Sequence, residues 1–174
     1  MNRDRDPGGR PRNARPRDGL GRLLARTQAD AGQAGLPDDL VLTGPDAARL
    51  ADQLLRAGRP FHAHEALEAA WKSAPPDERD LWQGLAQVAV GLTHAHRGNA
   101  RGAVTLLRRG AERVRAYCDR APAGGRSSHP YGIDIAAVLA SCDELAARIE
   151  LRGLAGIGDQ DLRPALLTAG PAAG

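Results

Sequence analysis

The chain has very few aromatic residues and only two cysteines. Among its 174 residues there are one Phe, two Trp and two Tyr, so the core must be built mainly from Leu, Val, Ile and above all Ala. Such residues suit helices that approach one another closely, and long strands are not expected. Cys118 and Cys142 lie inside amphipathic patterns and do not form a Cys-x-x-Cys pair. We interpret each as a small buried hydrophobic residue and expect no disulfide.

Long apolar runs are also missing. No stretch approaches the roughly 18 uninterrupted apolar residues that a membrane-spanning helix needs. The first 19 residues carry charges and prolines where a signal peptide would have its apolar centre. We therefore expect a cytoplasmic protein that does not associate with a membrane.

Lysine is nearly absent, since Lys72 stands alone beside 23 Arg. The net charge of +3 is unevenly distributed: residues 1–26 hold eight Arg against three Asp, whereas the remainder holds 16 Lys and Arg against 18 acidic residues. The basic character therefore belongs to an N-terminal arm. The excess of Ala, Gly and Pro is typical of a GC-rich genome, which weakens any functional interpretation of the arginines.

The length predicts one folded domain with flanking segments. Residues 1–42 are predicted to form a flexible basic arm and an extended connector, because residues 1–19 have almost no apolar side chains to bury. Residues 43–153 are predicted to form the helical domain, and residues 154–174 a tail rich in Gly, Ala and Pro. The tail has three leucines through which it can pack: Leu162, Leu166 and Leu167.

Apolar residues at helical spacing predict five helices, over about 45–57, 60–73, 77–97, 99–117 and 134–153. Thr43 and Asp46 form a helix-start pattern, and Asn99 and Asp134 are predicted N-caps. Short connections make consecutive helices antiparallel neighbours. The predicted fold class is therefore all-α, an up-and-down bundle of about five helices. A tetratricopeptide array is less favoured, because no 34-residue self-similarity is found.

Polar residues with catalytic or ligand-binding chemistry gather in the second predicted helix. At about 100° per residue, His64 lies on the edge of the apolar face beside Trp71, and Glu68 follows His64 by one turn. His64 and Glu68 can therefore touch the same atom. Glu65 and Lys72 lie on one side of this helix, which we interpret as a solvated face.

The third predicted helix carries a similar polar line. Gln83, Gln87 and His94 lie together on a side away from the leucines. Gly84 and Gly91, seven residues apart, leave a smooth strip that would let a neighbouring helix approach closely. If that neighbour is the second helix, His64, Glu68 and His94 converge with both glutamines around them.

This predicted polar centre has three interpretations. The residues can satisfy one another as a buried hydrogen-bond network, which is the favoured interpretation. They can instead line a pocket for a small ligand or for acid/base chemistry. Third, two His and one carboxylate suit Zn, Fe or Mn. Against a metal, the His-Glu-x-x-His motif and paired Glu-x-x-His motifs are both absent from the sequence.

Nucleic-acid binding and nucleophilic catalysis receive less support. Arg101, Arg108 and Arg115 recur every seven residues and could join the basic arm in a nucleic-acid surface. However, Glu112 interrupts this line and no aromatic residues stand between the arginines for stacking. There is also no Gly-x-Ser-x-Gly elbow and no Gly-x-x-x-x-Gly-Lys-Ser/Thr phosphate loop.

Two linked segments, residues 61–72 and 81–94, followed by Arg97-Gly98-Asn99 and Gly102-Ala103, resemble the small helical family catalogued as domain of unknown function 309. The resemblance covers about residues 45–117 and implies a compact all-α fold, but no established activity. It places eight residues at the signature positions of the family: His64, Glu65, Glu68, Trp71, Gln83, Gln87, His94 and Asn99.

The leading hypothesis is a non-enzymatic helical binding or scaffold domain that receives a small ligand or a segment of a protein partner. Its polar centre would consist of His64, Glu65, Glu68, Trp71, Gln83, Gln87 and His94. The first alternative is a metal-dependent or acid/base enzyme that uses His64, Glu68 and His94, with a divalent transition metal as its cofactor. The second is an adaptor that binds nucleic acid through the basic arm.

Overall fold

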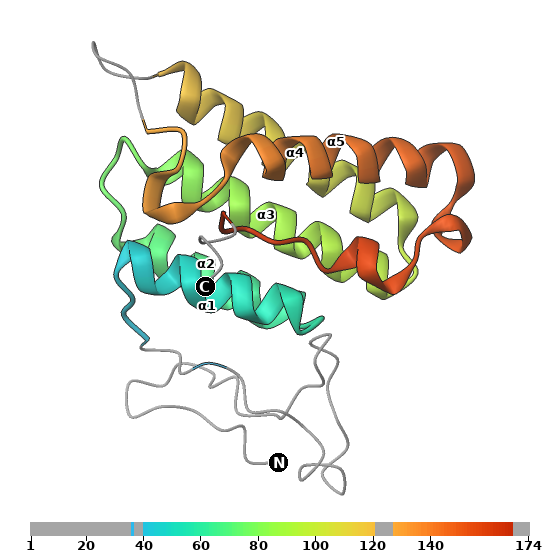
Figure 1. Cartoon of the computed structure of the whole chain (residues 1–174), viewed down its shortest axis with the longest axis horizontal. Helices are drawn as coiled ribbons and strands as arrows, with labels where there is room; N and C mark the ends of the chain where they lie inside the picture. Colours follow the sequence, from blue (N-terminus) through green and yellow to red (C-terminus); the bar gives the residue numbers. More distant parts are fainter. Residues whose placement is uncertain (1–35, 37–39, 121–126, 169–174) are drawn as a thin grey trace, which may run out of the picture.

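The computed structural model describes residues 36, 40–120 and 127–168 of the chain. Its helices are α1 (Gly44–Arg56), α2 (Pro60–Ser73), α3 (Arg79–His96), α4 (Ala100–Asp119) and α5 (Ile135–Arg152). Three short 3-10 turns follow α4 and α5: η2 (Pro130–Gly132), η3 (Leu154–Gly156) and η4 (Asp159–Leu162). Consecutive helices run in opposite directions (Figure 1), which confirms the predicted all-α bundle. None of the helices within these ranges is both long and apolar enough to cross a membrane.

The helix starts follow the side-chain caps that the sequence indicated. Thr43 Oγ1 accepts the Asp46 backbone N–H at 3.3 Å, Asn99 Oδ1 accepts that of Gly102 at 2.9 Å, and the Asp134 carboxylate caps α5. Such bonds satisfy backbone donors that a helix leaves open at its first turn.

Most helix limits lie within one residue of the prediction, and two differ by two residues. α3 begins two residues later than expected, because a turn in which Glu78 N–H donates to Pro75 O at 3.0 Å occupies the start of the segment. α4 continues two residues beyond Tyr117, to Asp119. Frayed helix ends are the least predictable part of a helix, and neither difference changes the fold.

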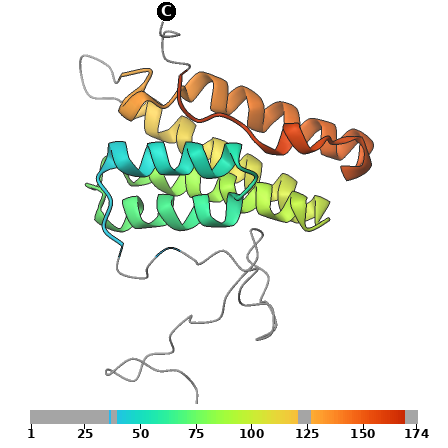
Figure 2. The same cartoon turned by 60° about the horizontal axis from the view of Figure 1, so that its bottom comes forward.

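α3 is the central helix of the bundle. It lies between α2 and α4 (Figures 1 and 2), and almost all of its middle section is buried. From Leu81 to Ala95 every residue is buried except four, which are half-buried: Gln83, Gln87, Val90 and His94. Burial on nearly every side explains why this helix is mostly apolar or small in composition.

The closest helix contact joins α3 to α4 through glycines. A Cβ atom on Gly84 would lie 2.8 Å from the carbonyl oxygen of Gly110, and one on Gly110 would lie 2.7 Å from that of Gly84. A Cβ atom on Gly91 would lie 3.0 Å from Leu107. The glycine strip of α3 therefore faces α4. This confirms the predicted close approach of a neighbouring helix, and that neighbour is α4, which carries the matching small residue Gly110.

The segment after α5 returns across α1 and is held there by one carboxylate (Figure 2). Asp52 Oδ1 accepts the backbone N–H groups of Leu166 at 2.7 Å and Leu167 at 3.1 Å. Asp134 N–H donates to Leu166 O at 2.9 Å, which pairs the segment with the loop before α5. We call Asp52 and its two backbone partners the Asp52 clasp. Leu166 is 1% exposed, so the leucines of the tail do pack into the core.

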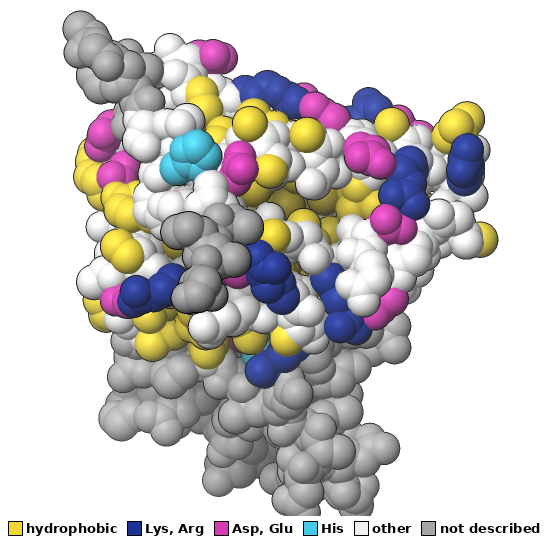
Figure 3. Space-filling view, viewed as in Figure 1, with side chains coloured by type: hydrophobic (Ala, Val, Ile, Leu, Met, Phe, Trp, Pro, Cys, Tyr) yellow, Lys and Arg dark blue, Asp and Glu magenta, His cyan; other side chains and the backbone are white. Residues whose placement is uncertain are grey.

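The two cysteines are free, as expected. Cys142 is buried, and burial raises the pKa of its thiol to about 12. It lines a small apolar cavity of about 20 Å³ beneath α5, where Figure 3 shows an apolar hollow. A cavity of that size has room for about one water molecule, so we do not regard it as a ligand site.

Candidate functional site

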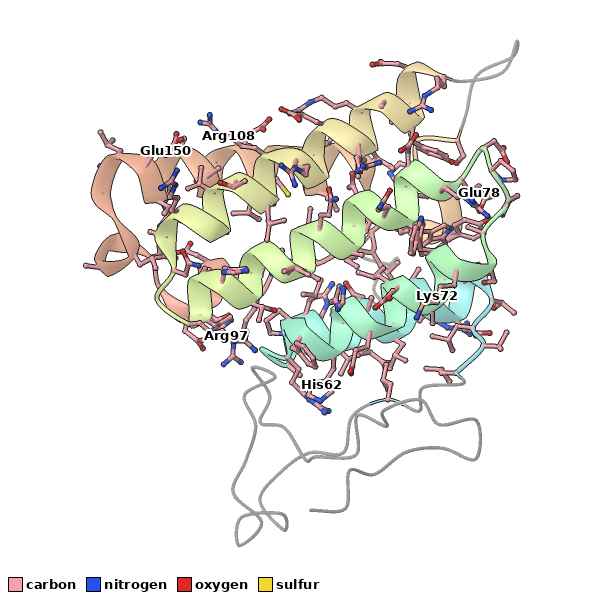
Figure 4. The ribbon with its side chains drawn as sticks, turned by 180° about the vertical axis from the view of Figure 1, so that it is seen from behind. His62, Lys72, Glu78, Arg97, Arg108 and Glu150 are labelled. Carbon is pink, nitrogen blue, oxygen red and sulfur yellow. The ribbon has the colours of Figure 1, made fainter. Side chains whose placement is uncertain are left out.

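The central helix reaches the surface along one narrow line. Gln83, Gln87, Val90 and His94 follow the spacing i, i+4, i+7 and i+11, which places them on one face of α3. We call these four residues the α3 window. Figure 4 views α3 with α2 on one side and α4 on the other. The window is thus the only polar opening in the middle of the most buried helix of the described structure.

α2 presents half-buried residues at a matching spacing. His64, Glu68 and Trp71 lie at i, i+4 and i+7 and share one face of the helix. His64 Nε2 lies 3.8 Å from Glu68 Oε2, and Lys72 Nζ lies 3.1 Å from Glu68 Oε1. Lys72 is 62% exposed, in accord with the solvated face expected for it. Glu65 is half-buried and accepts the Leu36 backbone N–H at 3.4 Å, so its carboxylate is engaged.

Burial controls the charge of His64. The ring is largely removed from water, which lowers the pKa of His64, and Lys72 lowers it further, while the Glu68 carboxylate raises it. Desolvation is the largest of these effects. His64 is therefore neutral at pH 7, and it can accept or donate one hydrogen bond at each ring nitrogen according to its tautomer.

One polar atom on α2 and one on α3 are buried without a hydrogen bond. Within the described ranges, neither His64 Nδ1 nor Gln87 Oε1 has a hydrogen-bond partner. The closed network in which these side chains satisfy one another is therefore incomplete at both atoms. Leaving a buried acceptor unsatisfied costs about 1–3 kcal/mol, so each of the two atoms requires an explanation.

His94 is held from the neighbouring helix. Asn99 Oδ1 accepts the Gly102 N–H, so Asn99 Nδ2 must be the atom that faces His94 Nδ1, at 2.8 Å. Because Nδ2 is a donor, Nδ1 is the acceptor and the proton of the neutral ring is on Nε2. A Cβ atom on Gly102 would lie 2.6 Å from Nδ1, so only glycine leaves room for this arrangement.

The three residues of the predicted metal set are not brought together. No group of three His, Cys, Asp or Glu side chains in the described segments is placed to hold a metal ion. His64 and Glu68 are neighbours, but His94 turns to Asn99, and its Nδ1 lone pair is occupied there. The physical reason is the glycine strip, which draws the His94 side of α3 toward α4.

The basic line on α4 is largely neutralised within the bundle. Arg108 Nη2 lies 2.5 Å from Glu150 Oε2, and Arg115 pairs with Asp143, both on α5. Arg101 is exposed. Residues 1–35, which hold most of the predicted basic arm, lie outside the described residues.

Two polar residues that matter in the structure were missed in the sequence. His62 is fully buried on α2, and Figure 4 places it on the side of the helix remote from α3, away from the window. It lies one turn before Ala66, and the small residues Ala63, Ala66 and Ala70 were the signal that this face is buried. Asp52 is 7% exposed and lies among the alanines and leucines of α1. Its place in this apolar pattern was likewise a signal in the sequence that the side chain is buried.

Comparison with known proteins agrees with the resemblance noted in the sequence. Residues 49–106 match the model of a family described as a domain of unknown function, DUF309. The uncharacterized protein YpuF of Bacillus subtilis (strain 168) is 46% identical over 48 residues, which are 27% of this chain and 28% of that protein. The alignment thus spans less than a third of this relative. No solved structure matches significantly.

Proposed function

We propose that the region matching the DUF309 family is a helical binding domain, and that a small ligand or a short segment of a partner protein binds over the α3 window. The single observation that carries this proposal is the pair of buried, unpaired atoms, His64 Nδ1 and Gln87 Oε1. A bound group that pairs with both would recover about 1–3 kcal/mol for each.

The surrounding side chains define the chemistry of the ligand. His94 offers an N–H donor at Nε2, and Gln87 offers an acceptor and the two donors of its amide. Val90 and Trp71 add half-buried apolar surface on either side. Donors and acceptors that alternate beside apolar surface suit an uncharged ligand that carries amide groups, either on a small molecule or on a peptide backbone.

Binding receives more support than catalysis. The enzyme alternative needs His64, Glu68 and His94 to act on one atom, and the orientation of His94 toward Asn99 works against it. In the tautomer that the Asn99 contact favours, Nε2 of His94 carries a hydrogen and acts as a donor. The window is therefore best suited to recognition.

The test is a protein-observed NMR titration of the full chain with a library of small primary and secondary amides. We expect shifts of the side-chain amides of Gln83 and Gln87 and of the His94 ring. The Gln87→Met variant should lose this response at about equal side-chain volume. Gln53→Met is the matched control, because Gln53 is an exposed glutamine on α1, and it should bind as wild type does. The proposal fails if amides leave the window unchanged, or if Gln87→Met responds as wild type does.

A further inference from the structure

A second polar region lies at the corner where the α1–α2 turn, the end of α3 and η4 meet. Arg163 follows η4, and its guanidinium lies on the turn: a Cβ atom on Gly58 would be 3.2 Å from both Cζ and Nε of Arg163. Gly58 has a φ of +68° and precedes Arg59, the N-cap residue of α2. His96, at the end of α3, interacts with the backbone of Leu162. None of these residues belongs to the α3 window.

Three nitrogens of this corner are buried without a bond. Arg59 Nε, Arg163 Nε and His96 Nε2 have no hydrogen-bond partner within the described ranges. Arg59 Nε and Arg163 Nε are donors on charged groups, and an unpaired buried donor costs more on a charged group than on a neutral one. His96 Nε2 accepts or donates according to the tautomer and protonation of the ring. That three such nitrogens occur in residues from three neighbouring elements indicates that something outside the described protein atoms satisfies them.

The charges at the corner are unbalanced toward positive. Asp159 is the carboxylate that pairs with Arg163, with Oδ2 2.5 Å from Nη2, and its side chain is 59% exposed. Arg59, which caps α2, makes no side-chain cap bond, and the first turn of α2 has no acidic residue. The positive end of the α2 dipole therefore adds to the two guanidinium groups. In Figure 3, basic side chains gather where α1 ends and η4 approaches it.

We propose that this corner is a binding site for a phosphate-type oxyanion, held by Arg59, Arg163 and His96 at the start of α2. The shared chemistry is that of free inorganic phosphate and of the phosphate group on a small organic monoester. Two planar guanidinium groups match the tetrahedral oxygens of phosphate, and a dianion balances their charge. Helix starts are also favourable positions for phosphate.

His96 links the site to pH. Burial lowers the pKa of His96, and Arg163 lowers it too, while Asp159 and the hydrogen bond with Leu162 raise it. A bound anion beside Nε2 would favour the protonated ring, whose N–H would then be satisfied. Binding of the dianion should therefore favour protonation of the His96 ring, and this contribution to the affinity should grow as the pH falls.

The test is calorimetric titration of the full chain with inorganic phosphate and, in parallel, with glycerol phosphate. Arg163→Gln and Arg59→Gln should each weaken binding about tenfold or more, because each removes a charge-assisted hydrogen bond. Arg49→Gln is the matched control: it removes the same charge from an exposed arginine of α1 whose ion pair is with Asp46, and it should leave the affinity unchanged. Tighter binding of glycerol phosphate than of phosphate would identify the monoester as the ligand, and the reverse order would identify the free anion.

Two further readouts keep the result independent of variant folding. In the wild-type chain, phosphate should shift the backbone amides of Gly58, Arg59 and residues 61–63 and raise the pKa of the His96 ring in an NMR titration. His96→Gln should remove the contribution of the His96 ring to the pH dependence of affinity but retain anion binding through the arginines. The proposal is overturned if neither anion binds the wild-type chain, or if both arginine variants bind as tightly as Arg49→Gln does.

Discussion

The Asp52 clasp and the α3 window both contain buried polar atoms, but only the clasp satisfies them within the described residues. Asp52 accepts two backbone N–H groups and a third bond from Arg56 Nε at 2.8 Å, so one carboxylate satisfies three donors. In the window, Gln87 Oε1 is buried with no partner in the described ranges. A polar group whose bonds are all made within the chain stabilises the fold, whereas one left open costs stability until something binds. This difference is the reason that we assign the Asp52 clasp to the stability of the fold and propose ligand binding for the α3 window.

A substitution at Asp52 is the most direct test of the difference between the Asp52 clasp and the α3 window. We expect Asp52→Ala to lower the free energy of unfolding by about 2–4 kcal/mol, because the buried N–H groups of Leu166 and Leu167 lose their acceptor. Chemical denaturation measures the loss, and hydrogen exchange should show faster exchange at both amides. Asp143→Ala is the control: Asp143 is 56% exposed and pairs only with Arg115 at the surface, so its loss should be less than about 1 kcal/mol. Equal losses of stability in the two variants would show that the Asp52 clasp stabilises the fold no more than a surface ion pair does.

Glu78 is a second polar residue whose side chain is hydrogen-bonded within the chain. Its carboxylate accepts Tyr131 Oη–H at 2.6 Å and Trp82 Nε1–H at 3.3 Å. We expect Tyr131→Phe to cost about 1 kcal/mol, the net value of one hydrogen bond. Burial and Glu78 raise the pKa of Tyr131 to about 12. Because the unfolded tyrosine ionises near pH 10, stability should fall as the pH rises from about 10 to 12, and Tyr131→Phe should not show this fall. A wild-type chain that loses no stability in this interval would contradict the assignment.

The window should respond in the opposite sense. Gln87→Met removes a buried acceptor that has no partner, so the free energy of unfolding should stay within about 0.5 kcal/mol of wild type or rise. Thermal and chemical unfolding measure the change, with Gln53→Met as the surface control. A loss of more than about 1 kcal/mol would instead assign Gln87 to a structural network, and the difference between the two regions would disappear.

The smallest expected effect is the pH dependence from His64. Its folded pKa lies below the unfolded value of about 6.5, mainly because of burial. The unfolded state therefore binds the proton first, and stability falls as the pH drops below about 6.5 until the folded ring is protonated as well. His64→Gln should flatten part of this fall, measured as stability at pH 7.5 and pH 5. His96 has a pKa lowered in the same direction, so His96→Gln measured in parallel separates the two contributions.

The fold was accessible from the sequence because its signals are local. Periodic leucines and alanines, together with caps at Thr43, Asn99 and Asp134, determine the helices through bonds between residues three apart. The half-buried line of Gln83, Gln87 and His94 was also visible, because a polar line on an otherwise apolar helix follows from helical geometry alone.

The orientation of the site was not accessible, because it depends on which helix pairs with which. Gly84 and Gly91 indicated a close neighbour but did not identify it. The partner surface includes Gly110 on α4, at least 19 residues away in the sequence, and its role appears only once the helices are packed. For the same reason the contact of His94 Nδ1 with Asn99 Nδ2 was not predicted, although Asn99 was identified both as a helix cap and as a signature position.

The Asp52 clasp also has a consequence for the order of events in folding. Its bond joins residues 114 positions apart, whereas the helix hairpins form between neighbours in the sequence. During synthesis α1 to α4 can assemble early, but the carboxylate on α1 has no backbone donors to receive until residues 166 and 167 have emerged from the ribosome. Distant contacts of this kind slow folding. We therefore expect the docking of residues 166 and 167 to come late in folding, and until it occurs the Asp52 carboxylate lacks its two backbone donors.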